Sequence, residues 1–478
     1  MSPTEHDETV ALPDPRTSRR LYQTGLAGLV AAVAGLVYKS DLVDPILLSL
    51  GAIIMIIGAW PALNWARRGD LHFPVFEIFM LTSIPFYAVP ILAGHPTMLQ
   101  FSAGATWNAA VSMLLFQLCA VAAFSGTTVR RGRSRFLTDS LLPATTLRYA
   151  STGILLNTVY LYVRGFTDLV PNELSIVLRA VFFGIGTVAL FVEMRRWGAG
   201  QLRGSEQAVI SLNLLLQLIF LFRDLYLIVG ISILLLALIG YVSTSRRIPI
   251  AVLVVVLPIV AVLHHGKTVM RTLYWEGKAP APNLTELPAF FETWFLQGLA
   301  DPTEQEATSN SLAGRLFERA SLFQMLCLVT ERTPEHEPYL AGESYKYVFA
   351  QLVPRILWPG KPSSLESNIL LAVHYGLVSR DSPASVSIAF GMIAESYANF
   401  GLIGCAVLGL LLGHVYKRIS VAAIGLPQFS GLGLLTILLA AWSFQVEQIF
   451  ATWLVSLLQA AFVVIGGPML FRTFFGQE

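Results

Sequence analysis

The chain has 478 residues, of which 55% are hydrophobic and only 13% are charged. Soluble domains carry about 25% charged residues, so this composition excludes an ordinary soluble protein. A formal net charge of +2 gives no basis for a nucleic-acid partner. Repeated apolar stretches of about 17 to 25 residues predict membrane-spanning α-helices, whereas a β-barrel would show alternating apolar and polar residues.

The N-terminal segment, residues 1–20, is polar and contains three arginines near its end. The apolar run that follows has no small-residue cleavage site, so we predict an uncleaved first helix rather than a signal peptide. The three cysteines are scattered, and Cys119 and Cys405 fall in predicted spans. This distribution predicts neither a disulfide framework nor a metal cluster.

Hydropathy predicts about twelve spans. Nine lie within 21–265, near 21–38, 42–63, 71–93, 103–125, 145–163, 174–194, 206–222, 225–242 and 249–265. Three lie within 385–471, near 386–416, 430–448 and 450–471, and residues 472–478 form a short tail. Only Arg223 and Asp224 separate the seventh and eighth spans, so one long broken helix is the alternative there.

The distribution of arginine and lysine predicts that both termini are cytoplasmic. Cations gather in the connections after even-numbered spans, which are inside if the N-terminus is inside. They are Arg67 and Arg68, the run RRGRSR at 130–135, Arg195, Arg196 and Arg203, Arg246 and Arg247, and Lys417 and Arg418.

Residues 266–384 form a long polar interruption, which this topology makes extracytoplasmic. Helical spacing predicts a helix over 310–330, and a second short helix over 342–353 ends before Pro354. The predicted fold is therefore an all-α polytopic membrane protein. It has about twelve transmembrane helices and one large, partly helical extracytoplasmic loop between helices 9 and 10.

The turn VPRILWPGKP, residues 353–362, combines cations with an aromatic ring on a proline-stiffened backbone. Arg355 and Lys361 are suited to a phosphate, and Trp358 offers a flat face for a sugar. The alternative is that the cations reach toward lipid headgroups and Trp358 belongs to the interfacial aromatic belt.

Other candidate side chains lie elsewhere in the loop. Arg315 and Arg319 share a helical face and require an anionic partner. That partner is either a bound anionic ligand or, as the structural alternative, Glu318. Glu343 lies on the second predicted helix, and His374 and Arg380 precede the tenth span. A lone loop histidine is more often a surface residue than a catalyst.

Glu395 lies inside an apolar run with small residues around it. An ionisable group at membrane depth marks a functional site by default, and the alternative is a structural pair with an arginine. Tyr397 and Asn399 follow on the same segment. The sequence contains no Walker loop, dinucleotide-binding glycine fingerprint, H-E-x-x-H or G-x-S-x-G motif.

Two stretches carry a resemblance to a known family. GESYKYVFAQLVPRILWPGKP (342–362) and AESYANFGLIGCAVLGLLLG (394–413) resemble the O-antigen polymerases, also called oligosaccharide repeat-unit polymerases. Arg380 and Gly391 reproduce a spacing described for their outer loops. The resemblance covers about 310–416.

The resemblance implies a metal-independent glycosyltransferase without a cofactor. It would transfer a growing glycan from one undecaprenyl diphosphate to another lipid-linked repeat unit at the outer face of a bacterial cytoplasmic membrane. The polymer would be an O-antigen, a capsule or an exopolysaccharide. Its partners would be the lipid-linked oligosaccharide as donor and acceptor, the lipid bilayer, and candidate proteins such as a flippase and a chain-length regulator.

Roles follow from this implied reaction. Arg355, Lys361 and Arg380 would bind the departing diphosphate, and Arg315 and Arg319 the second lipid carrier. Trp358, Tyr397 and Asn399 would contact sugars. A general base is needed, and Glu395, Glu343 and His374 compete for that role. The alternatives are an O-antigen ligase or a related polyprenyl-linked glycan transferase, and a flippase or exporter of lipid-linked oligosaccharides.

Overall fold

The computed structural model describes most of the chain. The residues described are 15–40, 44–94, 98, 100–129, 135–142, 146, 150–170, 172–225, 227–245, 247–275, 279–300, 322–353, 358–363, 365–379 and 388–475. Within them the regular elements are helices, and β-pairing is limited to an isolated bridge between Ser140 and Ser430.

Nine helices in the described part of the chain are long and apolar enough to cross a membrane. The protein is therefore an all-α, multi-pass membrane protein. Three other predicted spans correspond to α6 (Ala150–Phe166), α7 (Asn172–Gly198) and α18 (Gly431–Trp442). α6 and α18 have 17 and 12 residues, and α7 has 27. The total of about twelve spans stays a prediction.

The chain divides into two compact units, and the boundaries fall near 143 and 319. Unit 1 combines residues 1–143 with 320–478, and unit 2 is residues 144–319. The predicted extracytoplasmic segment 266–384 is thus shared between the units. Residues Leu322–Arg332 of that segment pack against helices of unit 1 that lie far away in the sequence.

Unit 1 contains the first and last helices of the chain. Its elements are α1 (Pro15–Lys39), α2 (Pro45–Arg68), α3 (Val75–Leu92), α4 (Ala103–Gly126), α5 (Arg135–Thr138), α14 (Leu322–Arg332), η4 (Glu343–Lys346), α15 (Tyr347–Leu352), α16 (Glu366–His374), α17 (Gly391–Ala422), α18, α19 (Phe450–Ala461), η5 (Phe462–Gly466) and α20 (Gly467–Phe475).

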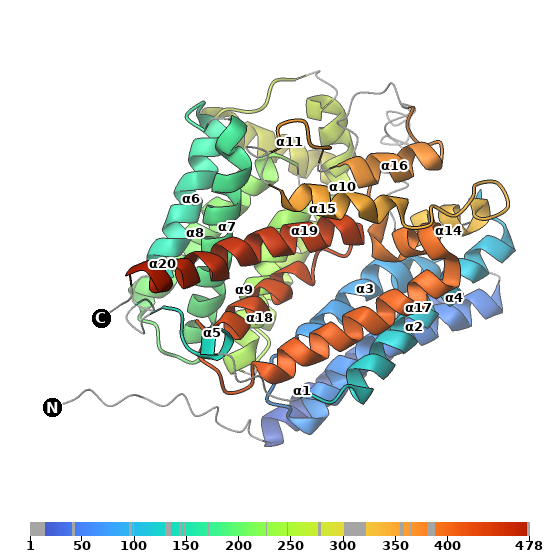
Figure 1. Ribbon diagram of the computed structural model, residues 1–478, viewed down its shortest axis with the longest axis horizontal. Helices are drawn as coiled ribbons and strands as arrows, with labels where there is room; N and C mark the ends of the chain where they lie inside the picture. The colour runs from blue at the N-terminus through green and yellow to red at the C-terminus, as the bar shows by residue number, and fades with distance from the viewer. Residues whose placement is uncertain are drawn as a thin grey trace. The chain divides into compact units, whose positions relative to one another are not determined.

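The contact between α4 and α17 is central to unit 1, and the two helices lie side by side in Figure 1. Small residues allow this close approach. A Cβ atom at Gly409 would lie 2.4 Å from the Phe116 carbonyl oxygen, and one at Gly413 would lie 2.2 Å from that of Ala120. Close backbone packing of this kind is a common basis for helix association within membranes.

Unit 2 is a second helical bundle. Its elements are α6, α7, α8 (Gly204–Arg223), α9 (Leu227–Ser245), α10 (Ile250–Trp275), η3 (Leu284–Glu286) and α11 (Leu287–Leu299). α8 and α9 are two separate helices joined by a turn, which settles the choice that the sequence left open. α10 extends ten residues beyond the predicted end of its span at 265, and the apolar helix α11 packs against it.

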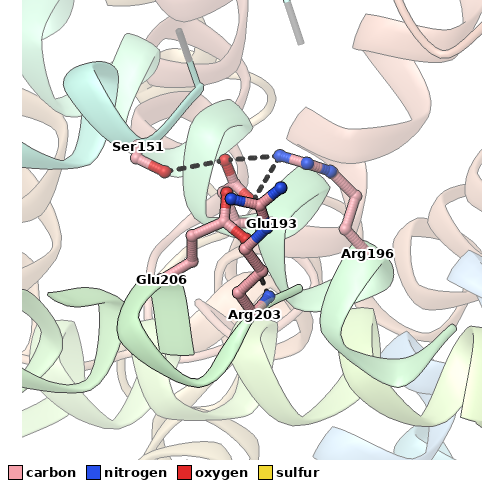
Figure 2. Close-up of polar contacts among 5 residues, drawn as sticks. All are labelled: Ser151, Glu193, Arg196, Arg203 and Glu206. Carbon is pink, nitrogen blue, oxygen red and sulfur yellow. Dashed lines mark hydrogen bonds and ion pairs between the residues drawn. The ribbon is translucent and has the colours of Figure 1, made fainter. Parts of the chain in front are cut away.

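Hydrogen bonds between buried polar side chains link helices of unit 2. The carboxylate of Glu193 is fully buried, and its Oε1 accepts a hydrogen bond from the Ser151 hydroxyl at 3.0 Å (Figure 2). Arg196 Nη1 donates to both carboxylate oxygens, at 3.1 Å to Oε1 and 3.0 Å to Oε2. In another contact, the Asn157 amide donates to Gln217 at 3.1 Å. These contacts hold α6, α7 and α8 in register.

Candidate functional site

The first turns of α17 form a buried segment that contains polar side chains. Every residue from Gly391 to Asn399 is buried, and the helix then breaks at Phe400 and Gly401. Gly401 has φ 62° and ψ −146°, a conformation that favours glycine. The break separates a short segment, 391–399, from the long remainder of α17. Glu395, Tyr397 and Asn399 all lie on the short segment.

Glu395 is 0% exposed, and both of its carboxylate oxygens are engaged. Oε1 accepts from the Ser344 hydroxyl at 2.9 Å. Oε2 accepts from the backbone N–H of Phe450 at 2.6 Å and of Ala451 at 3.4 Å. Phe450 and Ala451 are the first residues of α19, so the carboxylate lies at a helix N-terminus, where the helix dipole favours negative charge. Its described partners are a hydroxyl group and backbone amides rather than an arginine.

Asn399 joins the same network from one turn further along α17. Its Nδ2 donates to Ser344 Oγ at 2.9 Å and to the Glu395 carbonyl at 2.8 Å. Its Oδ1 accepts from the backbone N–H of Gly342 at 2.9 Å. Ser344 therefore accepts from Asn399 while donating to Glu395, and all three side chains are buried. The amide, hydroxyl and carboxylate fix one another's orientation.

Backbone hydrogen bonds extend the junction. The N–H groups of Leu340 and Ala341 donate to the carbonyls of Ala398 and Asn399 at 2.9 and 3.2 Å. On the other side of η4, the Ser367 hydroxyl donates to the Ser344 carbonyl at 2.8 Å. The segment around η4 is thus held by α17, α19 and the start of α16 together.

Aromatic rings close the junction around the buried carboxylate. The phenol of Tyr345 lies 3.2 Å from the Ser396 hydroxyl, and its ring packs against Phe400 and Phe450. Burial raises the pKa of the Tyr345 phenol far above its usual value. Tyr397 is 6% exposed, and its ring lies 6.5 Å from that of Tyr339. Its contact with a sugar stays a prediction.

The cations predicted to bind phosphate are only partly described. Lys361 donates its amine to the carbonyls of Gln351 and Val353 at 3.3 and 2.8 Å, near the end of α15. Trp358, in contrast, is 45% exposed. Four predicted arginines, Arg315, Arg319, Arg355 and Arg380, lie outside the described residues. Glu395, Tyr397 and Asn399 therefore lie together on the first turns of α17. Lys361 contacts the end of α15, which directly follows η4.

The other candidate bases differ from Glu395 in their exposure. The side chain of Glu343 is 52% exposed and forms an ion pair with Lys346, whose pKa is raised by this contact. His374 Nε2 lies 3.1 Å from the Pro338 carbonyl oxygen, at the end of α16. No group of three or more His, Cys, Asp or Glu side chains within the described residues is placed to hold a metal ion.

Sequence reasoning missed several polar residues. Ser344 is central to the network, yet a serine between glutamate and tyrosine gives no recognisable signal. Glu77 and Glu193 are buried within helices of the first half of the chain, at 3% and 0% exposure. The rule that identified Glu395, an ionisable residue inside an apolar run, would also have identified these two.

The fold and the buried junction define a multi-pass helical membrane protein whose late loop is fixed to α17 and α19. Residues 140–449 match the family described as a domain of unknown function (DUF8712). This match covers more than half of the chain, so the protein belongs to that family. Neither a curated protein nor a solved structure matches the sequence.

Proposed function

We propose that the protein is a glycosyltransferase that polymerises polyprenyl-diphosphate-linked oligosaccharide repeat units at the outer face of the cytoplasmic membrane. One observation carries the proposal. The two stretches that resemble repeat-unit polymerases, 342–362 and 394–413, are joined through Ser344, Glu395 and Asn399. The two stretches lie apart in the sequence, resemble the same family, and are in contact with each other at this junction.

The proposed reaction forms one glycosidic bond and breaks one glycosyl phosphate bond. A hydroxyl oxygen on the terminal sugar of the acceptor repeat attacks the anomeric carbon of the donor glycan. The bond from that carbon to the phosphate oxygen breaks, and undecaprenyl diphosphate leaves with the bonding electrons. The acceptor hydroxyl loses its proton to a base.

The described geometry supports different roles for the two glutamates. Glu395 is buried with both oxygens occupied, so we assign it as a positioning residue that holds η4 against α19. Glu343 lies on η4 with an exposed carboxylate, which leaves it accessible to an acceptor hydroxyl as the base. Trp358 offers an exposed ring for sugar contact, and Arg355 and Arg380 are the proposed diphosphate ligands.

Deletion of the gene followed by gel analysis of the surface glycan tests the proposal. A polymerase deletion removes the polymer ladder and leaves single repeats attached to the lipid core. Long chains that accumulate without attachment would instead identify a ligase. Repeat units trapped on the cytoplasmic side would identify a flippase, and either result would overturn the proposal.

Point variants test the proposed anion contact. Arg355→Ala should abolish polymer at a normal membrane level of the protein, and Arg355→Lys should restore only part of it because an ammonium group cannot bind phosphate in two places. The control is Arg418→Ala, an exposed cation near the other end of α17. Full-length polymer from Arg355→Ala would support the headgroup interpretation of this arginine.

A further inference from the structure

A cavity of about 260 Å³ lies in unit 1, away from the junction around Glu395. It is formed where α2 ends and α3 begins, with walls from the last turns of α4 and the later part of α17. Charged side chains of both signs line it, together with tryptophan. They are Trp60, Arg68, Asp70, His72, Glu77 and Lys417. Its volume exceeds that of several water molecules, so it has room for a small charged group.

Glu77 lines this cavity and has one carboxylate oxygen without a hydrogen-bond donor among the described residues. Its Oε1 lies 2.9 Å from His72 Nε2, and both residues are more than nine-tenths buried. Its Oε2 is buried and accepts no hydrogen bond from the part of the chain that the structure describes. A buried carboxylate oxygen without a donor is unfavourable, so the cavity is suited to a ligand that brings an N–H or O–H donor.

Cations line the same cavity. The ammonium of Lys417 lies 4.7 Å from the centroid of the Phe124 ring, which itself lies 6.0 Å from the ring of His72. Arg68 is in the last turn of α2. No ion pair within the described residues joins Arg68 or Lys417 to a carboxylate. Two cations that line the same cavity as a carboxylate oxygen without a donor fit a ligand that carries a phosphate and a hydrogen-bond donor together.

An apolar stripe connects this polar site to the outside of the bundle. Ile53, Ile56 and Trp60 recur at helical spacing on α2 and are 42%, 45% and 49% exposed. In a membrane-spanning helix such a stripe contacts acyl chains. Trp60 belongs both to the stripe and to the cavity wall, so apolar surface leads directly to the charged groups.

We propose that this cavity binds the headgroup of a phospholipid that carries both a phosphate and a primary ammonium. Arg68 and Lys417 contact the phosphate, and the ammonium donates to Glu77 Oε2, with Asp70 as a second carboxylate nearby. The acyl chains lie along Ile53, Ile56 and Trp60. The site lies at the turn between two membrane-spanning helices, which is the level of lipid headgroups.

Lipid competition tests the proposal. The purified protein is offered equal amounts of phosphatidylethanolamine and phosphatidylcholine with identical acyl chains, and bound lipid is counted by native mass spectrometry. Choline has no N–H donor, so we expect about a tenfold preference for the ethanolamine lipid, the scale of one charge-assisted hydrogen bond. The singly and doubly N-methylated lipids should fall in between. Equal binding across this series would overturn the proposal without any variant.

Variants locate the preference. Glu77→Gln should reduce the ratio of the two lipids to near one, whereas Arg68→Ala should weaken both lipids and keep their ratio. Arg67→Ala is the matched control, because Arg67 donates to Asn64 in the same helical turn and does not line the cavity. An unchanged ratio in Glu77→Gln, or an equal loss in Arg67→Ala and Arg68→Ala, would overturn the assigned contacts.

Two further probes identify the source of the headgroup. Phosphatidylglycerol has the phosphate but no ammonium, so it should bind more weakly than phosphatidylethanolamine. Soluble O-phosphoethanolamine lacks the acyl chains and should not displace the bound lipid at millimolar concentration. Displacement by the soluble compound would show that the cavity recognises a free solute rather than a lipid. A preference for phosphatidylglycerol would contradict the proposed contact between the ammonium and Glu77.

Discussion

Glu395 shows how a single buried carboxylate is stabilised without a cation nearby among the described residues. Backbone N–H groups at the start of α19 and the hydroxyl of Ser344 supply the donors. Exposed N–H groups at a helix N-terminus carry partial positive charge and bind anions readily. The carboxylate in turn satisfies backbone donors of α19 that have no partner within that helix. Removing its charge therefore affects the attachment of η4 and α19 to α17.

We expect Glu395→Gln to lower stability before it affects chemistry. The amide NH₂ cannot accept from a backbone N–H, so one side of the network loses its bonds, at a cost of about 1–3 kcal/mol. The melting temperature in detergent should fall, together with activity. Glu343→Gln is the control, because this exposed side chain should change chain extension with no shift in melting temperature. A stable but inactive Glu395→Gln protein would restore Glu395 as the base.

Ser344→Ala tests the same network from the loop side. Alanine removes the donor to Glu395 Oε1 and the acceptor of the Asn399 amide, and leaves both polar groups buried. We expect a loss of about 1–3 kcal/mol in the free energy of unfolding. Hydrogen exchange of the backbone around η4 should rise in parallel. Unchanged exchange would indicate that the backbone hydrogen bonds from Leu340 and Ala341 are sufficient to hold η4 against α17 without Ser344.

At the scale of elements, the break in α17 determines which residues reach the junction. Phe400 and Gly401 leave the helical conformation, and Tyr339 occupies the space beside Gly401. A straight helix would carry residues 391–399 in a different direction from the one observed. The break therefore orients Glu395 and Asn399 toward η4.

Gly401→Ala should be strongly destabilising. Its positive φ is unfavourable for any residue with a Cβ, and that atom would lie 2.8 Å from the Tyr339 hydroxyl. Strain of this kind costs on the order of 1–3 kcal/mol. Gly104→Ala in α4 is a suitable control, since its added Cβ meets no atom of the described residues within 4 Å. Equal melting temperatures for the two variants would contradict the importance of the break.

At the scale of the whole molecule, the sequence predicted the class of fold and most helix positions. Both follow from the length and apolarity of each stretch, which can be read directly from the amino-acid sequence. It also singled out Glu395 as an ionisable residue inside an apolar run, and the structure buries its side chain. It did not predict the hydrogen bonds of Asn399, which was proposed only as a sugar contact. It did not predict the partner of Glu395, because backbone N–H groups are common to all residues but proline. Ser344 was missed for a related reason, since its role depends on a tertiary contact across 51 residues.

Membrane topology is the whole-molecule prediction. Single cysteines would be introduced at two exposed positions, Glu335 and Arg67, in a protein without the native cysteines. In intact cells, with the outer membrane permeabilised where one is present, Glu335→Cys should react with a membrane-impermeant thiol reagent. Arg67→Cys should react only after the cytoplasmic membrane is broken. The reverse pattern would place the loop inside and end the proposal of a lipid-linked donor at the outer face.

The junction around Glu395 has a consequence for biosynthesis. Ser344 leaves the ribosome first, Glu395 follows 51 residues later, and Phe450 another 55 residues after that. At about 5–20 residues per second, roughly 5 to 20 seconds separate the first of these residues from the last. During that interval the segment around η4 has no α19 to pack against. A nascent chain arrested before Phe450 should therefore remain sensitive to protease near η4, whereas one extended through α19 should be protected.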